Sequence, residues 1–132
     1  MKITVDTNVL VRAVVQDDEK QARTAARVLK NADAVAIALP CLCEFVWVLT
    51  RVYSFGRQDI TDALDALLDA GNVVVNRPAV EAGLAVLNAG GDFADGVIAY
   101  EGSWLGGETF VSFDQKAVSL IAKHGQKAKL LT

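Results

Sequence analysis

The stretch that decides the fold is KITVDTNVLVRAVV, residues 2–15. Its first four residues have the pattern of a short buried strand, and residues 7–15 follow at once with the pattern of a helix. Asp6 lies at the junction between them. The same alternation of a short apolar strand and a helix runs through the rest of the chain. It predicts right-handed crossovers and a mostly parallel sheet covered by helices on both faces.

The alternation is regular enough to give expected bounds for each element. We expect one domain over residues 1–132, of the α/β class, with three layers and a central, mostly parallel sheet of four to five strands. A hydrophobic content of 52% and a mean hydropathy of +0.30 support a full buried core. The expected strands cover residues 2–5, 34–39, 73–76 and 109–112, with 128–131 as the fifth; the expected helices cover 7–15, 18–30, 40–53, 58–70, 78–89, 93–105 and 115–123.

The charge balance by itself argues against nucleic acid binding. The formal net charge is -3, and no basic block is present that would bind DNA non-specifically through its phosphates. A nucleic acid would have to be bound through local Lys and Arg side chains, through metal ions, or with the help of another chain.

The cysteines and the apolar runs indicate the compartment. Cys41 and Cys43 are two residues apart, so on a helix they point to different faces and cannot form a disulfide with each other. A reducing cytoplasm is the simple interpretation. No secretory leader is evident at the N-terminus, and no run approaches the roughly 20 apolar residues of a membrane-spanning helix.

Two aspartates follow predicted strands directly. Asp6 comes after the first strand and Asp114 after the fourth. Each could simply cap the helix that follows, because Asp is a favoured N-cap residue. In parallel sheets, however, ligands bind beyond the carboxyl ends of the strands. Two aspartates at that edge therefore favour a functional site.

Glu44 is the only charge in LCEFVWVL, residues 42–49. Burial of an unpaired carboxylate costs several kcal/mol, so a buried Glu44 would need a partner or a metal ion. The alternative is a helix edge at which Glu44 reaches water or pairs with an arginine.

Two further acids occur in GGDFADGVIAY, residues 90–100. Asp92 as N-cap and Asp95 at the third helical position would resemble a capping box. The capping interpretation is strong for Asp92 and weaker for Asp95, which we expect to point toward the strand ends.

The leading candidates are therefore Asp6, Glu44, Asp95 and Asp114, with Asp92 behind them. Carboxylates that lie close together repel one another and need compensating positive charge. No Lys or Arg lies directly beside them in the sequence, and Mg²⁺ or Mn²⁺ is the natural counter-charge for oxygen ligands. Such a site suits phosphodiester hydrolysis, because a bound ion activates water and stabilises the leaving oxygen.

These residues carry a family resemblance. The chain resembles the PIN-domain ribonucleases, and closely the VapC-type toxins of VapBC toxin–antitoxin pairs. The likeness covers nearly the whole chain and rests on four segments in order: VDTNVLVR, LPCLCEFVWVL, GGDFADGVIA and TFVSFDQKA.

The resemblance implies a cytoplasmic, metal-dependent endoribonuclease that forms a homodimer and binds a small cognate antitoxin near its acidic site. Its four acidic positions map onto the four leading candidates, which would be both catalytic residues and metal ligands. Asn8 and Ser112 match polar residues that support the site. Gly96 departs from the family pattern, in which Ala is more usual, but no acidic position is lost.

Alternatives from other classes have weaker support. A receiver-like, Mg²⁺-binding signalling domain would need adjacent acids after the first strand, where Thr7 follows Asp6. A catalytically silent PIN-fold binding module would keep the fold without turnover. Phosphate contacts could come from basic side chains that are more simply ordinary surface charges: Arg12, Arg51, Arg57 and Lys116.

Overall fold

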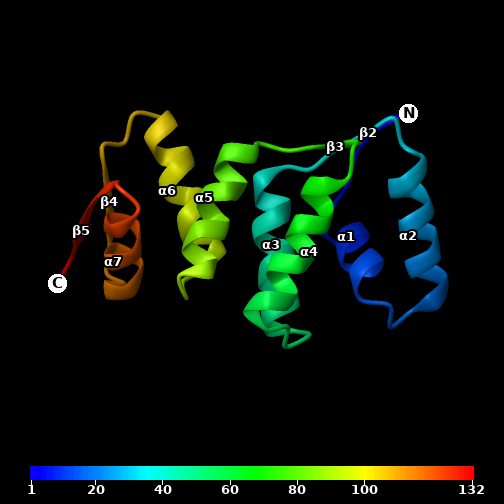
Figure 1. The fold of residues 1–132 in the computed structure, drawn as a ribbon, viewed down its shortest axis with the longest axis horizontal. Coiled ribbons are helices and arrows are strands. Elements are labelled where there is room, and N and C mark those ends of the chain that lie inside the picture. Colours follow the sequence, from blue (N-terminus) through cyan, green and yellow to red (C-terminus); the bar gives the residue numbers. More distant parts are fainter. The chain divides into compact units, whose positions relative to one another are not determined.

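The computed structural model describes residues 1–132 and divides the chain into two compact units, Met1–Asn76 and Arg77–Thr132. Each unit is described by itself. One or two helices separate each strand from the next along the chain (Figure 1), and every strand pairing is parallel. The predicted α/β class with parallel strands is confirmed. The strand ladders are formed within the units, as one three-stranded and one two-stranded group.

The first unit contains three strands in the order β1-β2-β3. Thr4 pairs with Ala36, and Ala36 pairs with Val74, so the carboxyl ends of all three strands lie at one edge. Helices α1 and α3 both begin a few residues beyond that edge and pack against each other. The elements are β1 (Lys2–Thr4), α1 (Thr7–Val14), α2 (Glu19–Asn31), β2 (Ala34–Ala36), α3 (Leu39–Arg51), α4 (Arg57–Asp69) and β3 (Val73–Val74).

The second unit begins with two helices and ends with a parallel strand pair. Helix α7 packs on both strands, and the core joins Val86, Ala99, Leu120 and Ile121, against which Phe110 packs. The elements are α5 (Arg77–Asn88), α6 (Phe93–Trp104), β4 (Thr109–Ser112), α7 (Gln115–Lys123) and β5 (Lys127–Leu130).

The expected bounds agree with the observed ones to within a few residues. The largest difference is in β2, which ends at Ala36 although a strand to residue 39 was expected. Leu39 already belongs to α3, whose first turn contains Pro40, a residue that suits this position. No helix in the structure is long and apolar enough to cross a membrane.

Two glycines allow α5 and α6 to lie side by side (Figure 1). A Cβ at Gly83 of α5 would come within 2.7 Å of the Phe93 ring and 2.8 Å of the Val97 side chain. A Cβ at Gly96 of α6 would collide with the Ala82 carbonyl oxygen and lie 2.8 Å from the Gly83 Cα. The backbones are therefore in direct contact, which explains why Gly96 stands where the family usually has Ala.

This contact gives a first prediction. Gly96→Ala should destabilise the protein by about 1–3 kcal/mol, because an added methyl group has rigid backbone against it and the helices must separate. Gly102→Ala lies in the same helix and meets nothing within 4 Å. It should leave the stability unchanged or raise it by up to about 1 kcal/mol, since Ala is the better helix former. Urea unfolding of the two variants measures the difference, and equal effects would contradict the close contact.

Candidate active site

Asp6 lies between β1 and α1. It is the N-cap of α1, and its Oδ1 accepts a hydrogen bond of 3.2 Å from the backbone N–H of Val9. The side chain is otherwise exposed. The capping interpretation is thus correct, but it occupies one carboxylate oxygen and leaves Oδ2 outside that bond. Capping holds the carboxylate in one place beyond the strand ends and does not compete with a functional role.

Glu44 lies on α3, and it is exposed. The premise that it is a buried carboxylate was wrong, and the helix-edge alternative is correct. Helix α3 buries Leu42, Phe45 and Leu49 along one face, while Trp47 on another side is 58% exposed. Apolar residues around the whole helix suggested burial, but only one face is covered. Solvation stabilises the Glu44 charge here, so burial no longer argues for a metal ion.

Asp6 and Glu44 nevertheless share one feature of the surface. Both line an open hollow of about 590 Å³ between α1 and the start of α3, together with Thr7, Asn8 and Cys41. The Thr7 hydroxyl donates to the Cys41 Sγ at 3.8 Å. Burial raises the pKa of the half-buried Cys41 thiol, and the charges of Asp6 and Glu44 raise it further, against the hydrogen bond from Thr7. Both carboxylates therefore act on the same thiol.

In the second unit, Asp92 and Asp114 are the N-caps of α6 and α7. Asp92 accepts from the backbone N–H of Ala94 at 3.1 Å, and Asp114 accepts from that of Ala117 at 3.1 Å. The backbone N–H of Asp114 donates in turn to the Ser112 hydroxyl at 2.9 Å. Ser112, predicted as a supporting residue, thus fixes the backbone that presents Asp114.

Asp95 lies in the first turn of α6 and is partly buried. Burial raises the pKa of its carboxyl above the ordinary value, and the charges of Asp92 and Asp114 raise it further. The ion pairs of the structure involve Asp17, Glu19 and Asp33 and leave these three carboxylates out. A cation near Asp95 would therefore be electrostatically favourable.

The structure thus forms two acidic groups, one in each unit. Asp6 and Glu44 share a hollow with Asn8, whereas Asp95 is influenced by Asp92 and Asp114. No three His, Cys, Asp or Glu side chains are grouped so that they could hold a metal ion. The donor chemistry fits Mg²⁺ or Mn²⁺, because all the leading candidates offer carboxylate oxygens. That the four serve one metal site remains a prediction.

Two residues of the hollow were missed in the sequence. Thr7 was considered only as the residue that follows Asp6, and Cys41 only for its redox state. The spacing of three between Cys41 and Glu44 was the available signal, since such residues share a helix face. Arg12, in contrast, was a candidate phosphate contact. Its guanidinium is paired with Asp17 at 2.9 Å, and Tyr53 also donates to Asp17 at 3.3 Å.

Comparison with known protein families identifies the class. The PIN domain family matches residues 3–120, so the chain belongs to that family. The match extends over most of both units. No curated protein matches the sequence significantly. PIN domains are generally nucleases with metal-dependent activity, and PIN nucleases in general bind RNA. The receiver-like alternative is thereby set aside.

The environment of Asp95 gives a second prediction. The pKa of Asp95 is higher in the folded protein than in the unfolded chain. Between these two pKa values the folded protein keeps a proton that the unfolded chain has lost. The stability of the protein therefore falls as the pH rises through this range. Asp95→Asn should therefore be more stable than the original protein at neutral pH, by at most about 1 kcal/mol for a partly solvated group. The difference should vanish below the ordinary pKa of aspartate.

Thermal melts in chelator, over a pH series, measure this difference. Asp65→Asn, an exposed position on α4, is the matched control for the change in net charge. An equal stability gain in Asp65→Asn, or a gain in Asp95→Asn that does not depend on pH, would contradict the raised pKa of Asp95.

Proposed function

We propose that this PIN domain is a metal-dependent endoribonuclease and the toxin of a toxin–antitoxin pair. One observation carries the proposal beyond the family's general activity. Asp95 lies under the influence of Asp92 and Asp114, its pKa is raised, and the ion pairs of the structure do not neutralise it. An arrangement that is unfavourable for the isolated protein is what a cation-binding site requires.

We assign the residues as follows. Asp6, Asp95 and Asp114 hold the divalent ion, and Glu44 orients the attacking water or holds a second ion. Asn8 and Asp92 support these carboxylates, and Ser112 fixes the backbone at Asp114. Bound Mg²⁺ or Mn²⁺ supplies an acidified water and stabilises the charge that develops on the leaving oxygen. The protein side chains position the phosphodiester, and the positive charge of a bound cation would keep the carboxylates ionised.

The role as a toxin rests on the four ordered sequence segments and on two exposed apolar side chains. The antitoxin and a second copy of the chain are the partners that we propose, in the cytoplasm. Helix α3 carries Trp47, 58% exposed, and is followed by Val52, 60% exposed. Exposed apolar side chains such as these two support contact with a partner protein. Of the two aromatic side chains Phe45 and Trp47 on this helix, only Phe45 is fully buried.

A third prediction tests catalysis. Purified protein, freed of any bound antitoxin, should cleave a mixture of structured RNAs with Mg²⁺ or Mn²⁺ and not with EDTA. Asp6→Asn and Asp95→Asn should each lower the rate by about 100-fold or more, since even outer-shell partners of a metal cost 10–100-fold. Asn caps a helix as well as Asp does, so Asp6→Asn removes the charge and keeps the start of α1. Asp65→Asn is again the control.

Two outcomes would overturn catalysis by these residues. Cleavage that persists equally in both variants would come from another site or a contaminating nuclease. Absence of cleavage in folded, antitoxin-free protein would favour the catalytically silent binding module.

A fourth prediction tests the role as a toxin. Induced expression of the chain alone in a bacterial host should arrest growth, and expression of Asp95→Asn at the same level should not. The expected reason is loss of RNA cleavage, so total RNA from the arrested cells should show new fragments. If the original chain and Asp95→Asn both arrest growth, the toxicity does not depend on the proposed site.

A further inference from the structure

An open hollow of about 510 Å³, which we call the α7 groove, lies on the surface of α7 and is lined only by residues of this helix and its N-cap. Asp114 lines one end, and Lys123 lines the other. Lys116, Ser119 and Lys123 are spaced so that they lie along one stripe of the helix, with buried Leu120 at the base. The two lysines are seven positions apart in the sequence, which places them about 10 Å apart along the helix axis.

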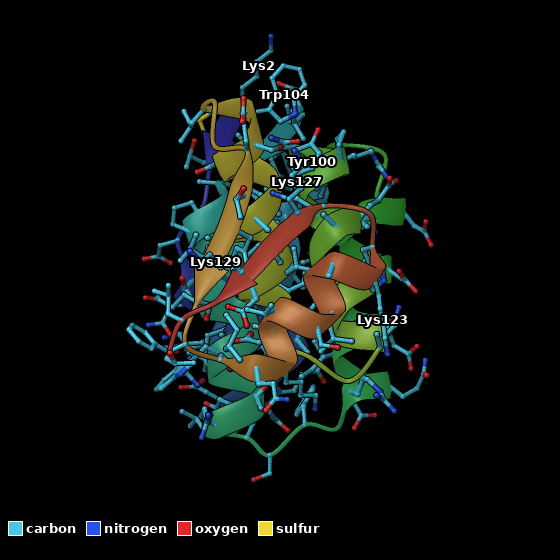
Figure 2. All side chains as sticks on the ribbon, turned by 90° about the vertical axis from the view of Figure 1, so that its left-hand side faces the viewer. Lys2, Tyr100, Trp104, Lys123, Lys127 and Lys129 are labelled. Atoms are coloured by element: carbon cyan, nitrogen blue, oxygen red, sulfur yellow. The ribbon has the colours of Figure 1, made fainter.

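The charge of this region is opposite to that of the chain as a whole. The net charge of the protein is -3, yet residues 115–132 contain four lysines and no Asp or Glu. These lysines are four of the five Lys and Arg residues of the second unit. Figure 2 labels three of them, Lys123 on α7 and Lys127 and Lys129 on β5. Helix α7 and β5 pack together, so the positive charge is concentrated on neighbouring elements.

The lysines of the groove are available for a ligand. Lys116 and Lys123 are both exposed, and neither forms one of the ion pairs of the structure. Helix stability accounts for only one of them. Lys123 in the last turn complements the negative end of the helix dipole, whereas Lys116 in the first turn adds to the positive end. Lys116 therefore costs helix stability and strengthens attraction for an anion.

We propose that this groove binds the phosphate backbone of RNA and leads the strand to the carboxylate of Asp114. The inference rests on the proposed function for its substrate class and adds the surface that holds the substrate. A nucleic acid strand carries one negative charge for about every 3.4 Å of a duplex axis, so two or more phosphates lie along the distance between the lysines. The carboxylate at one end repels phosphate unless a cation is bound there. The strand is thus held by the lysines and engages Asp114 only with metal.

The test measures binding apart from cleavage. A short, fluorescein-labelled single-stranded RNA of mixed sequence is titrated with the full chain in EDTA, at several salt concentrations, and anisotropy reports the Kd. Lys116→Gln/Lys123→Gln should weaken binding about ten-fold at low salt and lower the slope of log K against log salt by about 1.4, or 0.7 for each lost contact with a single strand.

Two matched variants separate the groove from simple charge. Lys20→Gln/Lys30→Gln on α2 changes the net charge equally and should leave binding nearly unchanged. Lys116→Arg/Lys123→Arg keeps both charges and should retain binding. Thermal melts confirm that each variant is folded.

The outcomes distinguish this inference from the proposed function. Weaker binding of the groove variant alone supports the groove, even if the original protein cleaves no RNA. If the original protein cleaves RNA but Lys116→Gln/Lys123→Gln binds RNA as well as it does, the inference about the groove is wrong. The proposed nuclease function is then unaffected. The inference about the groove is also wrong if Lys20→Gln/Lys30→Gln weakens RNA binding equally, or if the original protein binds no RNA.

Discussion

The contact of two helix backbones at Gly83 and Gly96 is the constraint on which the second unit depends. At these two positions α5 and α6 approach so closely that no side chain larger than the hydrogen of glycine fits between them. Phe93 and Val97 then fill the space that a Cβ at Gly83 would need. The first turn of α6 is thereby fixed, and that turn carries Asp95. The partly buried carboxylate of Asp95 is therefore positioned by main-chain packing of a helix rather than by a loop.

Three of the acidic residues cap helices, and capping is compatible with the role in catalysis that we propose for them. Asp6, Asp92 and Asp114 each accept a backbone N–H of the helix that they cap. Capping restricts the side chain and leaves its second oxygen outside that bond. A residue held in this way has already lost much of the side-chain freedom that ligand binding would cost. The chemical role that we propose would therefore use side chains that capping already holds in place.

The fold was predictable because its signals are local. Short apolar strands, helical periodicity and the Pro40 turn signal depend on neighbouring residues, and the expected bounds of β4 and α7 agree with the observed ones. The environment of Glu44 was not predictable in this way. Whether an apolar helix is buried all round depends on which elements cover it, and one side of α3, with Trp47, is left open. The pairing of Cys41 with Thr7 likewise depends on how α1 packs on α3.

The division into two units has a consequence for synthesis. Strands β1, β2 and β3 pair only among themselves, so none of their pairings needs a residue that is made after residue 76. The nascent chain then presents Asp6 and Glu44 but neither Asp95 nor Asp114. If the four acids serve one reaction, a ribosome carrying this message is not exposed to a working nuclease until the final third of the protein has emerged.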